Sequence, residues 1–179
     1  MNTEPKLYIP NRYIYEDSGL NANLVDLHQY AYDAETKNLG NLKYSITQQS
    51  NEKLVKCLVS SNRYVSCTTT KTNGYGYSDV TVEVNDGELT GKDTFRVYII
   101  SVNDKPVIKA IADNLLLEDS GHHSKLIDLH SYSYDVESKQ VDMTYSIESQ
   151  SKKSIVECKL ENKRYISCDT KLNQYGYSN

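Results

Sequence analysis

Several features that would define a function are missing from this sequence. It has no tryptophan and only one phenylalanine, although it has 16 tyrosines. No apolar run approaches the ~18 residues of a membrane span, and the first residues lack the basic patch and the apolar stretch of a signal peptide. A membrane-spanning helix is therefore not expected, and any signal or anchor is expected outside this chain.

Residues that catalyse reactions or bind polyanions are also sparse. The chain contains no Gly-x-Ser-x-Gly, His-Glu-x-x-His, phosphate-loop or dinucleotide motif. His28 and His130 lie beside apolar residues, which favours packing or surface positions over ligand roles, and residues 122–123 (His-His) are expected in a loop. The 20 basic and 24 acidic residues give a net charge of −4, whereas nucleic-acid binding needs clustered Lys and Arg. We expect neither an enzyme nor a nucleic-acid-binding protein.

What the sequence does contain is an internal repeat. The Glu-Asp-Ser-Gly of residues 16–19 recurs at residues 118–121, and the Leu-Val-Asp-Leu-His of residues 24–28 recurs as Leu-Ile-Asp-Leu-His at residues 126–130. Solenoid units usually run to ~20–50 residues, whereas a small β-sandwich domain needs about 100, which is the spacing of these repeats. The chain is therefore predicted to consist of two modules in series, an organisation more typical of proteins that hold, space or bind than of catalysts.

Alternating apolar and polar residues indicate β-strands throughout. Asn-Gly and Asp-Gly turns fall between the alternating segments. The first repeat is predicted to contain strands near residues 6–15, 23–28, 42–48, 54–59, 63–69, 80–85 and 94–102. A short helical turn is expected at residues 28–32. This number of short strands with regular turns predicts an all-β fold of Greek-key β-sandwiches.

The boundary between the repeats is predicted at the Asn-Asp-Lys-Pro of residues 103–106, which assigns residues 1–104 to the first repeat and 105–179 to the second. Nothing in the second repeat corresponds to residues 79–102, so that repeat is predicted to be incomplete and to lack its last two strands. A sandwich without them would expose its core and unpaired strand edges. Either the chain is a piece of a longer protein, or a neighbouring chain donates the missing strands by β-augmentation and builds a filament.

The cysteines form one pair in each repeat. Cys57 and Cys67 flank a predicted hairpin that turns near Asn62, and folding this hairpin places the two cysteines opposite each other, within disulfide distance. Cys158 and Cys168 repeat the arrangement. Free structural thiols are an alternative, whereas a metal site is disfavoured because no Cys-x-x-Cys is present and the pairs lie a domain apart. A disulfide in each domain would indicate an oxidising, extracellular compartment.

The acidic residues follow a pattern that resembles cadherin-like repeats. Its elements are Asp-Ala-Glu at residues 33–35, Asp-Gly at residues 86–87, the 103–106 linker, and Glu16 at the end of the first strand. Over essentially the whole chain, the sequence is similar to the tandem Ig-like or cadherin-like repeats of prokaryotic, especially archaeal, cell-surface proteins. The resemblance implies tandem cadherin-like sandwiches with calcium where domains join. One departure is Lys105, which stands where cadherins usually place another aspartate.

The resemblance also implies which residues would bind calcium. Calcium takes about six to eight oxygen ligands and favours carboxylates and carbonyl groups. A junction site would be formed by Glu16, Asn103, Asp104, Asp135 and Glu137. A half-site at the N-terminal end of the first repeat would be formed by Asn2, Asp33, Glu35 and Asp86. The alternative is that the acids only cap turns, a role that suits aspartate well.

Many of the tyrosines come in pairs two residues apart, a spacing that places both rings on one face of a strand. Tyrosine suits both half-buried sheets and interfaces, because its ring is apolar and its hydroxyl stays wet. The pairs therefore serve either as aromatic residues at the edge of the core or as a carbohydrate- or protein-binding surface. The candidates for such a surface are Tyr30, Tyr32, Tyr75, Tyr77, Tyr132 and Tyr134.

Together these features predict an extracellular structural or adhesive module, a stalk or adhesin segment of a surface protein, with calcium stiffening the linker between repeats. Its partners would be neighbouring repeats, copies of itself, or a cell-surface protein or glycan. The alternatives are a filament subunit joined by donor-strand exchange at the second repeat, and a carbohydrate-binding surface module.

Overall fold

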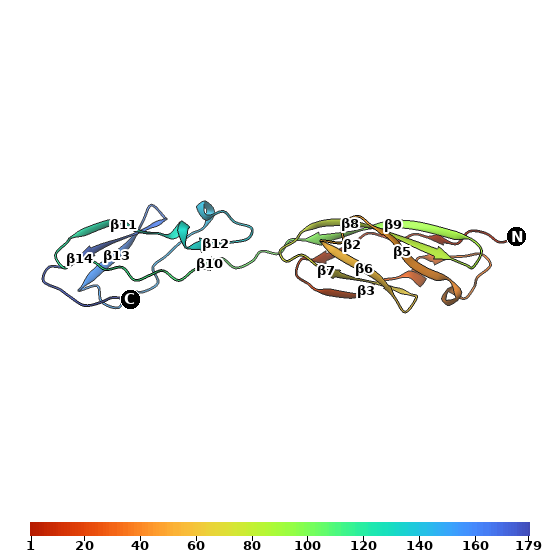
Figure 1. Cartoon of the computed structure of the whole chain (residues 1–179), viewed down its shortest axis with the longest axis horizontal. Helices are drawn as coiled ribbons and strands as arrows, with labels where there is room; N and C mark the ends of the chain where they lie inside the picture. Colours follow the sequence, from red (N-terminus) through yellow and green to blue (C-terminus); the bar gives the residue numbers. More distant parts are fainter. The chain divides into compact units, whose positions relative to one another are not determined.

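The computed structural model describes residues 1–179, which form two compact units, Met1–Val102 and Asn103–Asn179 (Figure 1). The division lies close to the predicted boundary after residue 104. Almost all of the regular structure is β-strand, as the alternation of apolar and polar residues predicted. None of the helices has the length and apolar character needed to cross a bilayer.

The first unit is a sandwich of two sheets. One sheet has the strand order β2-β9-β8-β5 and the other has the order β3-β7-β6. β2 runs parallel to β9, whereas the other pairings in these sheets are antiparallel. The strands are β1 (Lys6–Leu7), β2 (Arg12–Tyr15), β3 (Leu20–Asp26), β4 (Ala31–Tyr32), β5 (Lys43–Gln49), β6 (Val55–Ser60), β7 (Tyr64–Thr69), β8 (Gly76–Asn85) and β9 (Thr90–Ile100).

The single strand predicted at residues 6–15 is two strands in the structure. β1 pairs with β4, whereas β2 joins β9 in the four-stranded sheet. Pro10 lies between them and has no N–H for a ladder hydrogen bond, so the chain changes partner there. The helical turn predicted at residues 28–32 is a 3-10 helix, η1 (Leu27–Gln29), and a second short helix, η2 (Leu39–Asn41), precedes β5.

The core of the first unit lies between the two sheets and depends strongly on β8 and β9. Val80, Val82, Val84, Phe95 and Val97 are each no more than 1% exposed. Burial of one such side chain contributes about 1.5–3 kcal/mol. Apolar side chains at alternate positions of this hairpin therefore belong to the core, in agreement with the period-two pattern of the sequence.

The outward-facing residues of β8 and β9 pair with one another across the hairpin. The directly opposed pairs are Tyr77–Tyr98, Asp79–Arg96, Thr81–Thr94 and Glu83–Lys92. Two hydrogen bonds, of 2.7 and 2.9 Å, join the guanidinium to the aspartate, and the two threonine hydroxyls lie 2.8 Å apart. The lysine Nζ lies 3.1 Å from the glutamate carboxylate. Cross-strand pairs contribute roughly 0.2–1 kcal/mol each, so the hairpin is stabilised on both of its faces.

Two side-chain amides tie the sheets of the first unit together. Gln49, in β5, donates to the carbonyl oxygen of Cys57 (2.9 Å) and accepts from its N–H (2.8 Å). Asn62, in the turn between β6 and β7, donates to the carbonyl oxygen of Leu42 (2.7 Å) and accepts from the N–H of Tyr44 (3.0 Å). Each amide thus satisfies one donor and one acceptor on the edge of the opposite sheet.

The second unit repeats only part of this architecture. It has a sheet of order β11-β14-β13 and a short pairing of β10 with β12. Its strands are β10 (Val107–Ile108), β11 (His122–Asp128), β12 (Ser133–Tyr134), β13 (Val156–Glu161) and β14 (Tyr165–Thr170). Its 3-10 helices are η3 (Leu129–Ser131) and η4 (Gln140–Asp142). Residues 114–117 and 144–150, the counterparts of β2 and β5, have no strand pairing, and no strand corresponds to β8 or β9, as the repeat pattern predicted.

The second unit also retains only one of the two amide contacts. The Gln150 side chain donates to the carbonyl oxygen of Cys158 (2.6 Å) and accepts from its N–H (2.8 Å), as Gln49 does with Cys57. Lys163 stands at the repeat position of Asn62, and its ammonium has no acceptor atom. The segment that corresponds to β5 is therefore held at only one of the two positions.

Candidate functional site

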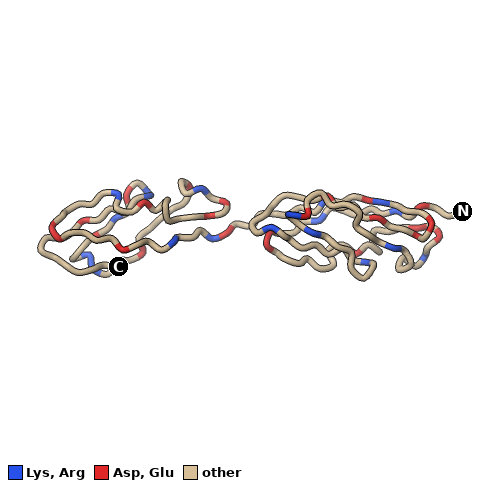
Figure 2. The backbone as a smooth tube through the Cα atoms, in the orientation of Figure 1, with Lys and Arg blue, Asp and Glu red and all other residues tan.

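Several acidic residues lie along the chain at the end of the first unit that carries the N-terminus (Figure 2). The Asn2 amide donates to Asp86 Oδ2 (3.0 Å) and to Glu88 Oε2 (3.2 Å). Asp86 Oδ1 accepts from the N–H groups of Leu89 and Glu88, both at 2.7 Å. These two hydrogen bonds hold the pKa of Asp86 below its ordinary value, because they favour the charged carboxylate. Two of the predicted half-site residues, Asn2 and Asp86, are thus in contact.

The other two half-site residues follow β4. The N–H and the hydroxyl of Thr3 donate to Glu35 Oε2 (3.2 and 2.7 Å). Asp33 is 7% exposed, and its Oδ2 accepts from the N–H of Thr36 at 2.8 Å. Its Oδ1 is buried and has no hydrogen-bond partner. A buried acceptor without a partner costs about 1–3 kcal/mol, so Asp33 keeps one oxygen that a ligand would stabilise.

Glu16 is held at the point where the chain leaves the first unit. Its N–H donates to the carbonyl oxygen of Ile100 (2.9 Å). Its Oε1 accepts from the Ser101 hydroxyl (2.9 Å) and from the Val102 N–H (2.7 Å). The residue is 6% exposed, and its Oε2 is buried without a partner. Glu16 therefore resembles Asp33 in having one satisfied and one unsatisfied carboxylate oxygen.

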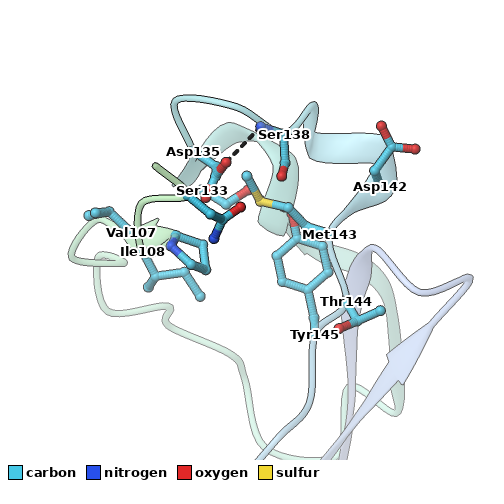
Figure 3. Close-up of a pocket in the computed structure, with 11 residues that line it drawn as sticks. Val107, Ile108, Ser133, Asp135, Ser138, Asp142, Met143, Thr144 and Tyr145 are labelled. Carbon is cyan, nitrogen blue, oxygen red and sulfur yellow. Dashed lines mark hydrogen bonds between the residues drawn. The ribbon is translucent and has the colours of Figure 1, made fainter. Parts of the chain in front are cut away.

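The remaining predicted junction residues belong to the second unit: Asn103, Asp104, Asp135 and Glu137. The Asn103 amide donates to the carbonyl oxygen of Asp104 (2.9 Å), and the Asp104 N–H donates to Glu137 Oε2 (3.0 Å). Asp135 Oδ1 accepts from the N–H groups of Glu137 (3.1 Å) and Ser138 (2.6 Å; Figure 3). In both units, an acidic loop thus binds the segment that precedes the first strand.

These acids therefore have a turn-capping role as well as the donor chemistry that calcium requires. Asp33, Asp86 and Asp135 all accept backbone N–H groups, which is the role of turn caps. The donors near them are carboxylate, amide and carbonyl oxygens, which suit a hard cation such as calcium. No three Asp, Glu, His or Cys side chains are already grouped as a metal centre. Calcium binding at these residues remains a prediction.

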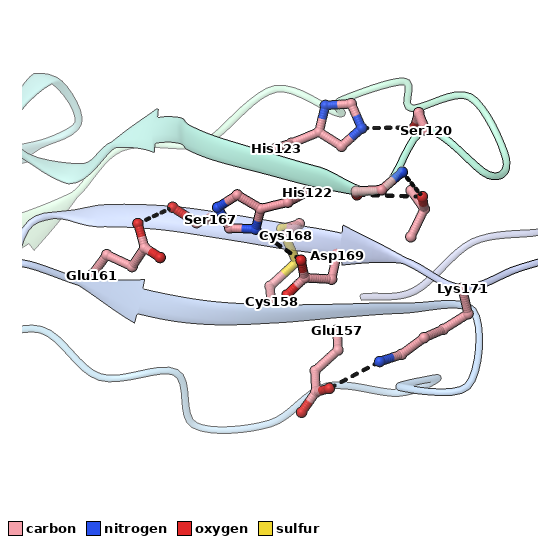
Figure 4. A network of polar contacts seen from close by, with 12 residues as sticks. Ser120, His122, His123, Glu157, Cys158, Glu161, Ser167, Cys168, Asp169 and Lys171 are labelled. Atoms are coloured by element: carbon pink, nitrogen blue, oxygen red, sulfur yellow. Dashed lines mark hydrogen bonds and ion pairs between the residues drawn. A yellow bond between two sulfur atoms is a disulfide. The ribbon is translucent and has the colours of Figure 1, made fainter.

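Both predicted disulfides are present. The S–S distance is 2.04 Å for Cys57–Cys67 and 2.01 Å for Cys158–Cys168, and no free cysteine remains. Each bond joins directly opposed residues of a hairpin, β6–β7 in the first unit and β13–β14 in the second (Figure 4). The free-thiol and metal alternatives are therefore excluded by the structure. Disulfides of this kind persist in oxidising compartments.

The prediction that residues 122–123 lie in a loop is wrong, because both begin β11. They pair with β14, where His122 is opposite Asp169 and His123 is opposite Cys168. His122 Nδ1 lies 2.8 Å from the Asp169 carboxylate, and His123 Nε2 lies 2.7 Å from the Ser120 hydroxyl (Figure 4). The histidine that contacts the serine is thus not the one that contacts the aspartate. The three residue types do not form a catalytic relay.

The paired tyrosines differ in exposure. Tyr32, Tyr75, Tyr77 and Tyr134 are between 49% and 70% exposed, whereas Tyr30 and Tyr132 are half-buried. Tyr30 packs against the core, and its hydroxyl accepts from Arg12 (2.9 Å). Its backbone closes η1 rather than extending β4, so the two-residue spacing does not place it beside Tyr32.

A row of tyrosines that the spacing did not reveal crosses the four-stranded sheet. Tyr13 in β2 lies opposite Tyr98 in β9, which lies opposite Tyr77 in β8. The Tyr13 and Tyr98 rings stack with centroids 4.9 Å apart, and the Arg96 guanidinium lies 3.8 Å from the Tyr77 ring centroid. The stacked pair of rings and the cation–π contact of Arg96 both stabilise the sheet. The outward positions were visible in the alternation, but the register between distant strands was not.

The layers, the strand order and the repetition define a cadherin-like β fold. No protein-family model and no curated protein matches the chain. Among solved structures, it is similar to protocadherin gamma B7 extracellular cadherin domains 1–4, with a TM-score of 0.53 and 15% identity over 96% of this chain and 42% of that one. It is also similar to the protocadherin gammaB4 extracellular domain, with a TM-score of 0.51 and 12% identity over 97% of this chain and 29% of that one. The chain spans less than half the length of either structure.

Proposed function

We propose that this chain is an adhesive or load-bearing segment of an extracellular protein, with calcium bound at its acidic loops. The observation that carries the proposal is the pair of buried carboxylates, Glu16 and Asp33, each of which has one oxygen without a partner. The two disulfides and the extracellular cadherin domains of similar fold support the extracellular location.

The charge distribution supports a cation at these loops. Like charges in a partly buried site repel one another unless a counter-ion neutralises them. In the first unit, calcium would be held by Asn2, Asp33, Glu35 and Asp86. In the second unit, calcium would be held by Asn103, Asp104, Asp135 and Glu137, and Glu16 offers a further carboxylate where the chain leaves the first unit. Calcium supplies positive charge that neutralises these acids, and neutralisation would stiffen a linker that otherwise flexes.

Calcium titration of the full chain tests the proposal. We expect heat of binding in the millimolar to sub-millimolar range typical of extracellular modules. At a calcium concentration tenfold above Kd, the folded state gains about 1.4 kcal/mol, which raises the melting temperature. Glu16→Gln should reduce the heat and the thermal shift, because it removes the negative charge of the carboxylate. Glu52→Gln, which removes a carboxylate charge at an exposed position outside the predicted ligand set, is the matched control.

Two results would contradict the proposal. One is the absence of both heat and thermal shift at about 10 mM calcium, well above the affinity of most extracellular modules. The other is an equal effect of Glu16→Gln and Glu52→Gln. Small-angle scattering of the same samples, with and without calcium, then tests the mechanical role. If calcium stiffens the linker, the scattering profile of the monomer changes when calcium is added.

A carbohydrate- or protein-binding surface is the second candidate function. It is supported by the exposed rings of Tyr32, Tyr75 and Tyr77, because exposed tyrosine is enriched in recognition surfaces. Retention of the chain on a glycan array that is lost with Tyr75→Ala or Tyr32→Ala would favour this role. Binding that is unchanged by both substitutions would argue against it.

A further inference from the structure

Tyr13 and Tyr98 are held ring against ring by the strand pairing of the first unit. They lie directly opposite each other in the parallel strands β2 and β9. Their rings are 8° from parallel and their centroids are 4.9 Å apart, which is close to the strand spacing of about 4.8 Å. In an offset stack at this distance, carbon atoms of one ring touch carbon atoms of the other. The backbone register thus keeps two phenol rings in contact.

This pair of rings is open to solvent on the outer face of the four-stranded sheet. Tyr13 is 64% exposed, and Tyr98 is half-buried. Tyr77 lies on the other side of Tyr98, but its ring is tilted by 57° and its centroid is 6.4 Å away. The Arg96 guanidinium lies 3.8 Å from the Tyr77 ring centroid and covers one face of that ring. Tyr98 therefore has one close and parallel ring partner, which is Tyr13.

The composition of the chain directs one-electron oxidation to tyrosine. Tryptophan and free thiols are the side chains that compete with tyrosine for one-electron oxidants. The chain has no tryptophan, and its four cysteines are all in disulfides. It has 16 tyrosines instead. Tyrosine is therefore the main target of such an oxidant in this chain, and a radical on one ring of a stacked pair has a second phenol beside it.

We propose that Tyr13 and Tyr98 are a site of oxidative cross-linking, at which a dityrosine bond joins β2 to β9. A one-electron oxidant from outside the chain, such as a peroxidase with hydrogen peroxide, removes one electron and one proton from each phenol. The two radicals couple through the ring carbons next to the hydroxyl groups. Each coupled carbon then loses its proton, each oxygen takes one up, and both rings become aromatic again. Overall, two phenols and one hydrogen peroxide give one dityrosine and two waters.

A bond at this position closes a covalent loop over most of the first unit. The loop runs from residue 13 to residue 98 and encloses β3 to β8. A cross-link that closes a long loop stabilises the fold by restricting the unfolded chain. It also transmits a pulling force from β2 to β9 without loading the enclosed strands. Neither effect requires calcium, so the inference does not depend on the proposed metal ion.

Oxidation of the full, disulfide-bonded chain tests the proposal. The probe is a ruthenium tris-bipyridyl photo-oxidant with persulfate, which is small enough to reach half-buried phenols, and a dilute sample disfavours links between chains. We expect a monomer with dityrosine fluorescence and a mass lower by two hydrogens. Proteolysis should yield one cross-linked species that contains Tyr13 and Tyr98. The melting temperature of the first unit should rise by about 10 °C or more.

Phenylalanine variants provide the matched comparison. Tyr13→Phe and Tyr98→Phe keep the stacked ring and remove the hydroxyl that forms the radical, so both should abolish the cross-link in the monomer. Tyr8 is 69% exposed, much like Tyr13, but its ring stacks on no other tyrosine. Tyr8→Phe should therefore leave the yield nearly unchanged. The melting temperatures of the unoxidised variants show whether each one folds like the parent chain.

Three results would overturn the proposal. The first is a monomer without dityrosine under conditions in which free tyrosine couples in the same reaction. The second is a cross-linked species that maps to other tyrosines, or the same yield from Tyr13→Phe as from the parent chain. The third is an equal loss of yield for Tyr8→Phe and Tyr13→Phe, because stacking would then not select the pair. Calcium titration is a separate measurement, so none of these results decides the proposed metal site.

Discussion

At the residue scale, the side-chain amide of Gln49 is predicted to contribute a measurable part of the stability of the first unit. It pairs with both backbone groups of Cys57, a residue that is fully buried. Gln49→Ala should lower the free energy of unfolding by about 1–3 kcal/mol, because a buried donor and a buried acceptor lose their partner. Urea denaturation of the disulfide-bonded chain measures this loss when unfolding is monitored with a probe in the first unit.

The neighbouring residue provides the control for this substitution. Gln48 is exposed, and Gln48→Ala should change the free energy of unfolding by no more than about 0.5 kcal/mol, as for most surface substitutions. If both variants had the same stability as the parent chain, water would be replacing the amide of Gln49, and the two sheets would be held by side-chain packing alone.

Residue-level features were predictable only where they depend on residue type and on spacing along the chain. Cys57 and Cys67 flank a short predicted turn, and folding the hairpin places them opposite each other. Their disulfide was therefore predictable from the sequence. The identity of the acids at the loops was also visible. The unpaired oxygens of Glu16 and Asp33 were not, because burial and hydrogen bonding depend on contacts between residues that are far apart in the chain.

At the element scale, the close approach of Pro5 to β9 fixes the N-terminal segment of the first unit. A Cβ placed on Gly91 would lie 1.8 Å from the carbonyl oxygen of Pro5. Gly91→Ala should therefore displace this segment, weaken the contact of Asn2 with Asp86, and lower stability by about 1–3 kcal/mol. Faster hydrogen exchange at residues 2–7 and a lower melting temperature are the expected readouts.

Gly40→Ala is the matched substitution, because Gly40 is exposed and a Cβ placed on it would lie no closer than 3.2 Å to another atom, the side-chain oxygen of Asn38. It should leave hydrogen exchange at the N-terminal segment unchanged. An equally small effect of both substitutions would mean that Pro5 can move away from β9 at little cost. The N-terminal acidic loop would then not depend on this contact for its position.

The elements were predicted in type and approximate position, but their partners were not. Alternation identified the strands around residues 80–85 and 94–102, because each has one face in the core. Alternation could not show that Pro10 divides the first predicted strand in two. Nor could it show that β2, the second of these strands, pairs with β9, which is far away in the sequence. Strand partners are set by packing across the whole domain, and local pattern contains no information on that packing.

At the scale of the whole molecule, the repeat predicted two sandwiches and the absence of two strands from the second. The consequence that the sequence did not show is energetic. The first unit buries the inner face of the β8–β9 hairpin and pairs its outer face internally, whereas the second keeps its disulfide, one amide contact and an open apolar face. Within residues 1–179, the β8–β9 hairpin therefore closes a core in the first unit for which the second unit has no equivalent strands.

The topology of the first unit also predicts how it resists force. β2 lies near the beginning of this unit's sequence and β9 lies near its end. The two strands are parallel and in register, from Arg12 opposite Val97 to Tyr15 opposite Ile100. Pulling residues 1 and 102 apart loads these hydrogen bonds together in shear. Pulling residues 75 and 102 instead separates the antiparallel strands β8 and β9 one pair at a time. Single-molecule extension should give a higher unfolding force for the first pair of handles than for the second. Equal forces would mean that the β2–β9 pairing bears no load, and a mechanical role for the chain would lose its structural basis.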